Sequence, residues 1–490
     1  MVSRALAGPF GGHRPSPLAS VSGGAAGLIG LTVAALIFAA LIGMLPLAAA
    51  AAVAIGIPIV VLAAAVPRVC LVLVIFSIPF SSLTKVTFGT FDVTATDPLV
   101  ALLIGGWLVR GALRDQIVVR IGPIIVAMIV LFCSQLLSTL TATSFSSSLK
   151  ELIKTAEMIA VATYVLSNLD VREAPFMLLT LLAAGTVESL NGLRQFVTRS
   201  GPEFFAIGPF LRAYGDFGQP NALAGYLGML LPFGIALALR PTGIWQRIAV
   251  VAMTGVIGAG ILASLSRGAW LGTGIGLVVM AIVGSPRTRR ALIGALGAVA
   301  GIVSLAAVGA LPKDITDHIT VLFDNFGVFD VRTVAVNPAN FSVVERMAHW
   351  QAGWAMAMDH PLVGIGPGNF DDVYDRYSLP GWSESLGHAH NYFINTFAEM
   401  GIIGLFAFVG FLSIVFARLV HGLRLATEPL GTERLLLLAA LGASIAFCVH
   451  NTFDNMFVHG IGLLFALILG LVELAVRELE SDQVVHAHRN

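Results

Sequence analysis

The sequence predicts an all-α fold, a polytopic transmembrane helix bundle of about 12 to 14 spans with one large extracytoplasmic loop. Charged residues make up only 11% of the 490 residues, whereas a soluble protein carries roughly 25%. Hydrophobic residues reach 57%, and they gather in runs near the ~20 residues that a helix needs to cross a bilayer. No basic patch with interleaved aromatic residues accompanies the net charge of zero, which excludes nucleic acid as a partner.

The apolar runs divide the chain into five parts. We expect a disordered cytoplasmic N-terminus over 1–23, transmembrane helices over 24–310, an extracytoplasmic loop over 311–391, transmembrane helices over 392–476 and a cytoplasmic tail over 477–490. The predicted spans lie near 24–43, 47–66, 69–83, 97–112, 121–140, 151–168, 174–195, 221–239, 246–264, 268–284, 291–311, 392–419, 433–450 and 457–476. Most of the 28 Lys and Arg residues fall in cytoplasmic loops when both termini are placed inside.

The long loop contains one predicted helix, from Phe341 to Met358. Apolar side chains recur there at three- and four-residue steps, at Val343, Met347, Trp350, Trp354 and Met358. This spacing gives a helix one apolar face, while Arg346 and His349 lie off it. Pro361 ends the helix, because the residue before a proline disfavours helical geometry. We expect an amphipathic helix at the outer membrane–water boundary.

Polar residues gather at span ends that the topology places outside. They come from five places: Arg212 and Asn221; Ser264, Ser266 and Arg267; Arg346; His388, His390 and Asn391; and Asp454. Guanidinium groups bind phosphate in a bidentate way, and a neutral histidine is the usual general base for a hydroxyl. Together these groups suit a lipid-linked phosphate or diphosphate whose sugar is attacked by an alcohol.

Each of these residues also has an ordinary structural interpretation. An arginine at a span end often extends to the interface, Asn221 can cap a helix, and Asp454 can pair with an arginine. Glu399 lies inside an apolar run, where an ionisable group is costly to desolvate and usually has a partner or a task.

Several chemistries lack support. No GxxxxGK[ST] is present, so ATP is not indicated as a cofactor. No HExxH occurs, and His388 and His390 are two apart, a spacing that predicts opposite sides of a strand, so we expect no metal. Cys70, Cys133 and Cys448 fall in apolar spans without CxxC spacing, which favours buried small side chains over a disulfide or zinc site.

Four segments resemble the O-antigen ligase and O-antigen/exopolysaccharide polymerase superfamily of bacterial envelope proteins. They read RAYGDFGQPNALAGYL, ASLSRGAWLG, ERMAHWQAGWAMAMDHPLVGIGPGNF and HAHNYFINTFAEMGIIGL, and the resemblance covers about Leu211 to Phe457. The resemblance implies a bundle of about twelve helices in the bacterial inner membrane, with a large extracytoplasmic loop between late spans.

The resemblance also implies an activity. Such proteins are inverting, metal-independent glycosyltransferases without a cofactor, and they move a glycan from undecaprenyl diphosphate to a hydroxyl of a glycan, lipid or protein acceptor. When the family's site residues are matched to this sequence, the resemblance implies that His390 is the base and that Arg267 and Arg346 bind the diphosphate, with Arg212 a third candidate. His388, Asn391, Asn221, Ser266, Asp454 and Glu399 are supporting candidates. Ligase, polymerase and protein glycosyltransferase share these motifs.

A different class stays open. A transporter or flippase of lipid-linked glycans would use the same arginines to hold phosphate, and transporters often show inverted repeats and broken helices. The sequence shows no internal repeat, and its polar residues lie at span ends on one side, which favours an enzyme. A membrane anchor that presents the outer loop to partners would leave the arginines unexplained.

Overall fold

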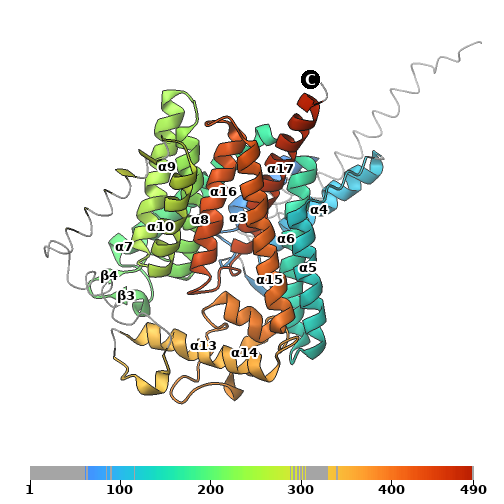
Figure 1. Ribbon diagram of the computed structural model, residues 1–490. Helices are drawn as coiled ribbons and strands as arrows, with labels where there is room; N and C mark the ends of the chain where they lie inside the picture. Colours follow the sequence, from blue (N-terminus) through green and yellow to red (C-terminus); the bar gives the residue numbers. More distant parts are fainter. Residues whose placement is uncertain are drawn as a thin grey trace, which may run out of the picture. The chain divides into compact units, whose positions relative to one another are not determined.

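The computed structural model describes residues 65–83, 85–88, 91–114, 116–286, 329–337 and 340–487, with residue 61 and isolated helical positions between 289 and 304 (Figure 1). The predicted N-terminal disorder, the predicted span at 24–43 and nearly all of that at 47–66 lie outside the described residues. The same holds for most of the predicted span at 291–311 and for the first part of the loop, from 311 to 328.

The described residues fold mainly into helices, as predicted. Before the long loop these are α3 (Pro67–Ser77), α4 (Thr96–Leu113), α5 (Pro123–Ser138), α6 (Phe145–Asn168), α7 (Ala174–Thr198), α8 (Pro220–Leu239), α9 (Ile244–Ala263) and α10 (Arg267–Val283). After it come α15 (Tyr392–Leu425), α16 (Thr432–His450) and α17 (Ile461–Ala487). Among the described residues, 7 helices are long and apolar enough to cross a membrane: α4, α5, α7, α8, α9, α15 and α16. This confirms a polytopic helix bundle.

Short irregular elements connect the helices. Two antiparallel hairpins, β1 (Val86–Phe88) with β2 (Phe91–Val93) and β3 (Ala206–Ile207) with β4 (Phe210–Leu211), were not predicted. Three 3₁₀ turns, η1 (Thr139–Thr141), η2 (Val171–Glu173) and η3 (Glu203–Phe205), adjoin the helices. The predicted span at 69–83 is shorter than expected, since α3 ends at Ser77 and Pro79 follows, whose ring and missing N–H cannot continue a helix.

Close packing of α10 against α16 brings two site segments to one end of the bundle. Gly272 and Gly276 lie four residues apart on one face of α10, and a Cβ at Gly272 would stand 2.7 Å from the Ala446 carbonyl oxygen of α16. Gly276 likewise approaches the carbonyl of Gly442. Small residues at this spacing let helix backbones approach closely. Because the two helices run antiparallel, the start of α10 lies beside the end of α16.

The predicted loop helix is confirmed as α13 (Phe341–Asp359), followed by α14 (Phe370–Val373) and the 3₁₀ turn η5 (Tyr374–Arg376); the turn η4 (Val331–Thr333) precedes it. Figure 1 shows α13 and α14 at the end of the bundle, where α13 packs against α15. Small residues such as Ala348 and Ala352 are buried, while Trp354 and Met358 of the predicted apolar face are 55% and 48% exposed. The predicted apolar face is therefore divided: Met347 is buried with the small side chains, whereas Trp354 and Met358 lie outside.

A break in α15 anchors the loop to the bundle. Gly401 lies in a left-handed conformation (φ 63°) inside the helix, and the turn that follows α13 fills the gap. The Ile402 N–H donates to the Pro361 carbonyl (2.8 Å), and the Gly366 N–H donates to the Glu399 carbonyl (2.9 Å). Backbone groups that the break would leave without partners are satisfied in this way.

We predict that Gly401→Ala destabilises the protein by at least about 2 kcal/mol. A Cβ there would collide with the backbone of Leu362, and alanine disfavours positive φ. Gly410→Ala, in the same helix, is the control, because a Cβ at Gly410 meets nothing within 4 Å. Thermal unfolding in detergent measures both variants, and equal midpoints would contradict the role of the break.

Candidate functional site

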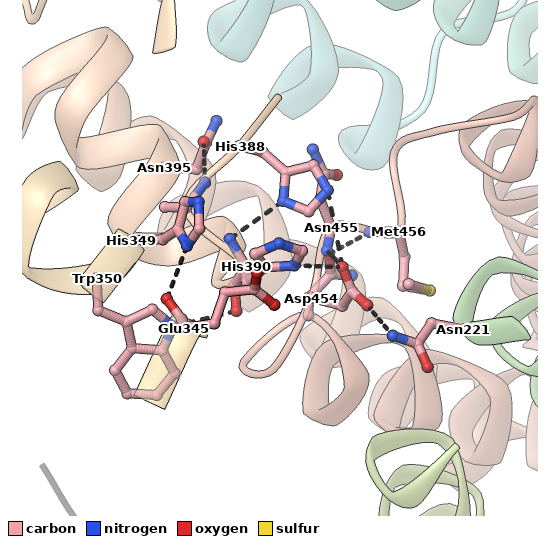
Figure 2. A network of polar contacts seen from close by, with 12 residues as sticks. Asn221, Glu345, His349, Trp350, His388, His390, Asn395, Asp454, Asn455 and Met456 are labelled. Carbon is pink, nitrogen blue, oxygen red and sulfur yellow. Dashed lines mark hydrogen bonds and ion pairs between the residues drawn. The ribbon is translucent and has the colours of Figure 1, made fainter. Parts of the chain in front are cut away.

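A buried carboxylate, Asp454, holds the site together from the loop between α16 and α17. It is 5% exposed. Its Oδ2 accepts a hydrogen bond from the Asn221 amide (2.6 Å). Its Oδ1 lies 3.3 Å from Nδ1 of His390 and 3.7 Å from Nε2 of His388. Figure 2 shows both histidines and Asn221 turned toward this one side chain.

His390 is held by its backbone as well as by its ring. Its φ of 51° is left-handed, a conformation in which histidine is several-fold enriched among non-glycine residues. The Trp350 indole N–H donates to the His390 carbonyl (3.1 Å), and the His390 N–H donates to Nδ1 of His388 (3.1 Å). With Nδ1 facing Asp454, the opposite atom, Nε2, is buried and has no hydrogen-bond partner within the described part of the chain.

The start of α15 fixes where this histidine lies. The Asn391 side chain caps the helix by accepting from the N–H groups of Phe393 (3.0 Å) and Ile394 (3.1 Å), as N-cap residues do. The Tyr392 N–H donates to the Asn451 carbonyl (2.8 Å), which joins the start of α15 to the end of α16. Asn391 therefore supports the site as a helix cap.

Two of the predicted arginines reach the site from separate segments. Arg212 follows β4, and its Nε donates to the Ser264 carbonyl (2.8 Å) while Nη2 donates to the Asn221 amide oxygen (2.8 Å). Asn221 also donates to Asp454, so it links Arg212 to that carboxylate. Arg267 begins α10, and its Nη2 donates to Ser342 Oγ on α13 (3.2 Å).

The third arginine, Arg346, lies one turn along α13 from Ser342. Its Nε is buried without a hydrogen-bond partner among the described residues. Burial, followed by the charges of Arg346 and Arg267, lowers the pKa of Arg212 to about 9. The Arg346 and Arg267 guanidinium groups are therefore close enough to that of Arg212 to repel it. Such a group of cations is stabilised by an anion placed between its members.

The protonation states of the acid and of one histidine follow from their surroundings. Burial raises the pKa of Asp454, but the His390 hydrogen bond and the positive charge of Arg346 oppose it, and the pKa lies well below its usual value. Burial, aided by the charge of His390, lowers the pKa of His388 to about 3. Asp454 is thus ionised and His388 neutral near pH 7.

His388, His390 and Asp454 could in principle ligate a metal ion, since one ligand atom of each lies within 4.8 Å of the others. The hydrogen bonding disfavours this arrangement. His388 Nδ1 accepts the His390 N–H, so neutral His388 carries its proton on Nε2, the atom that faces Asp454 and would have to bind the metal. The nearby arginines also favour an anion over a cation.

The remaining predicted residues lie at the edge of the site. Ser266 is buried before α10, and its N–H donates to Ser264 Oγ (3.2 Å). Glu399 accepts the Phe370 N–H through Oε1 (3.2 Å) and lines a neighbouring cavity. The hydrogen bond from Trp350 to the His390 carbonyl was not predicted, because Trp350 fits the apolar face of the loop helix. Its indole N–H is the one feature of the sequence that indicates a polar contact there.

Comparison with known proteins agrees with this geometry. Residues 252–409 match the model of a protein family described as O-antigen ligase, which confirms the resemblance found in the sequence motifs. The matched stretch contains Arg267, Arg346, His388 and His390, and it covers about a third of the chain. No curated protein matches the sequence. The match and the apolar helices support a bacterial membrane glycosyltransferase of the O-antigen ligase or polymerase type, acting on glycan and lipid substrates.

We predict that His388 makes the protein less stable as the pH falls below 6.5. The pKa of His388 is about 3 in the folded chain against a usual 6.5, so between these values the unfolded chain takes up a proton that the folded chain refuses. Stability should fall by about 1 kcal/mol per pH unit from this group alone. His388→Gln lacks this contribution, and its thermal midpoint should decline less than that of the wild type between pH 6.5 and 5. Parallel pH profiles would contradict a neutral His388.

Proposed function

We propose that this chain moves a glycan from an undecaprenyl-diphosphate carrier to an acceptor hydroxyl at the outer face of the bacterial cytoplasmic membrane, with inversion and without a metal. The family match over residues 252–409 supports the class of enzyme. The observation that carries the finer proposal is the Asp454–His390 pair, in which the histidine Nε2 has no hydrogen-bond partner among the described residues, beside three partly buried arginines.

The pair supplies a general base. In the tautomer that the geometry favours, His390 donates from Nδ1 to Asp454, which leaves the Nε2 lone pair to accept the proton of the acceptor hydroxyl. The acceptor oxygen then bonds to the anomeric carbon of the donor glycan as the bond from that carbon to the diphosphate oxygen breaks. Asp454 stabilises the imidazolium that forms, and attack opposite the leaving group inverts the anomeric configuration.

The arginines supply the electrostatic part of the reaction. Negative charge builds up on the departing diphosphate, and preorganised cations stabilise such charge where it develops. Arg212, Arg267 and Arg346 come from three different segments, so an anion bound among them would contact all three. Diphosphate is a good leaving group, and the reaction therefore needs no separate general acid.

The proposal includes an orientation. The ends of the helices that carry the site, together with α13 and the rest of the loop 311–391, would face the outside, and both termini would face the cytoplasm, as the distribution of Lys and Arg predicts. A flippase remains the alternative, and the broken helix α15 is a feature that transporters share. The backbone groups at that break are engaged by the turn after α13, through Ile402 and Gly366, so they do not serve a ligand.

A direct assay tests the whole proposal. Purified protein is incubated with an undecaprenyl-diphosphate glycan and candidate acceptors, with EDTA and without nucleotide, and the product is analysed by mass spectrometry and NMR. We expect a new glycosidic bond of inverted configuration. Failure of every acceptor, or a strict requirement for a divalent cation, would reject the mechanism.

We predict that His390→Ala lowers the transfer rate by about 10² to 10⁴, the usual contribution of a general base, while the folded protein still binds the lipid diphosphate. His390→Asn is the companion variant, because asparagine tolerates the left-handed backbone and removes only the imidazole. Product formation is followed over time, and carrier binding is measured by native mass spectrometry. Full activity in either variant would exclude His390 as the base.

We predict that Arg267→Lys lowers transfer about tenfold although the charge is kept, because the loss of one charged hydrogen bond is worth about 1.5 kcal/mol or more. Arg194→Lys is the matched control, since Arg194 is exposed on α7 and its side chain donates to Asn191 of the same helix. Turnover numbers for both variants are compared in the same assay. Unchanged turnover in Arg267→Lys would make that residue an interface anchor.

A further inference from the structure

We propose that the cavity lined by Glu399, which lies beside His388 and apart from the arginines, binds a neutral sugar unit of the acceptor glycan. This inference rests on the proposed function and names the acceptor side of the same site. The cavity has a volume of about 280 Å³ and is lined by α5, α6, α15, the turn after α13 and the loop between α16 and α17. Figure 2 shows three of its lining residues, His388, Asn395 and Asn455, close to His390.

A buried amide oxygen that has no hydrogen-bond partner among the described residues indicates that the cavity is a binding site. Gln135 of α5 is 5% exposed, it lines the cavity, and its Oε1 is buried without a hydrogen-bond partner among the residues that the structure describes. Leaving such an acceptor unsatisfied costs about 1–3 kcal/mol. A sugar hydroxyl in the cavity would donate to it. A second amide, Gln219, lines the cavity just before α8.

The other lining groups favour a neutral, hydroxyl-rich ligand. Lys154 and Glu151 of α6 form an ion pair (2.6 Å), and the other carboxyl group of the lining, Glu399, accepts the Phe370 N–H, so each of these ionisable groups already has a partner. Tyr392 also lines the cavity, and its ring is stacked on that of Phe457 (ring centroids 4.4 Å apart). A lipid tail would leave the buried amide oxygen without a partner, which excludes it as the occupant.

The position of the cavity assigns it to the acceptor. The described lining of the cavity comes from α5, α6, α15, the residue before α8 and the loops next to α13, α15 and α16, and it contains none of Arg212, Arg267 and Arg346. His388 joins the two regions, since it lines the cavity and contacts both His390 and Asp454. In an inverting transfer the nucleophile approaches the anomeric carbon from the side opposite the leaving group. A diphosphate among the arginines therefore leaves the cavity side for the attacking hydroxyl.

The volume limits what the cavity can take. It lies just below the roughly 300 Å³ at which pockets for small molecules begin. The cavity therefore holds one sugar unit of the acceptor, and the rest of the glycan extends outside it.

Two glutamine substitutions test the assignment. Gln135→Met and Gln219→Met keep the side-chain length and remove the amide, and Gln116→Met, at an exposed position before α5, is the control. In the transfer assay each cavity variant should raise the acceptor KM about tenfold, the worth of a well-formed hydrogen bond, and leave the donor KM unchanged. Saturation-transfer NMR with the methyl glycosides of glucose, galactose, mannose and N-acetylglucosamine measures sugar binding without the donor.

The outcomes separate this inference from the proposed function. Sugar binding that is lost in Gln135→Met but kept in Gln116→Met supports the cavity even if no transfer occurs. Transfer with an unchanged acceptor KM in both cavity variants would overturn the inference and leave the proposed function intact. A raised donor KM would overturn the acceptor assignment. The absence of binding by every methyl glycoside in the wild type would also overturn it.

Discussion

The site depends on a single buried negative charge. Asp454 is ionised in a place that desolvates it, and such a charge persists only when hydrogen bonds and opposite charges compensate the loss of water. Asn221 donates to one of its oxygens, and the rings of His388 and His390 face the other. Segments that are hundreds of residues apart in sequence are thus fixed around one carboxylate, and the imidazole that it orients is fixed with them.

Much of this arrangement could be predicted from local patterns. Long apolar runs give the helices, and polar residues at their ends stand out because a membrane span tolerates few of them. In this way Arg212, Arg267 and His390 were singled out from separate stretches, and the structure brings them to one end of the bundle. The loop helix was predicted from its period and from Pro361, both of which are readable without tertiary contacts.

Other features depend on contacts that no local pattern contains. Gln135 lies in the middle of an apolar run, and its unpartnered oxygen becomes visible only when α5 packs beside a cavity. Trp350 fits an apolar face, yet its indole donates to the His390 carbonyl forty residues away. The break at Gly401 is stable only because the turn near Pro361 satisfies its backbone. Local patterns indicated the candidate site residues, whereas the contacts that position them are visible only in the folded chain.

The break at Gly401 divides α15 into a long segment that can cross the bilayer and a short segment that is attached to the loop. One straight helix would have to do both. At ~1.5 Å per residue, the segment from Gly401 to Leu425 is about 37 Å long, enough to cross a hydrocarbon layer of ~30 Å. The segment from Tyr392 to Met400, about 14 Å long, is held by the loop at one end and by the Asn391 cap at the other. Bilayers of different thickness can be accommodated by tilting the long segment while the short one keeps its attachments. We therefore expect the depth of the His390 ring to be set by its attachments within the protein rather than by the lipid composition of the bilayer.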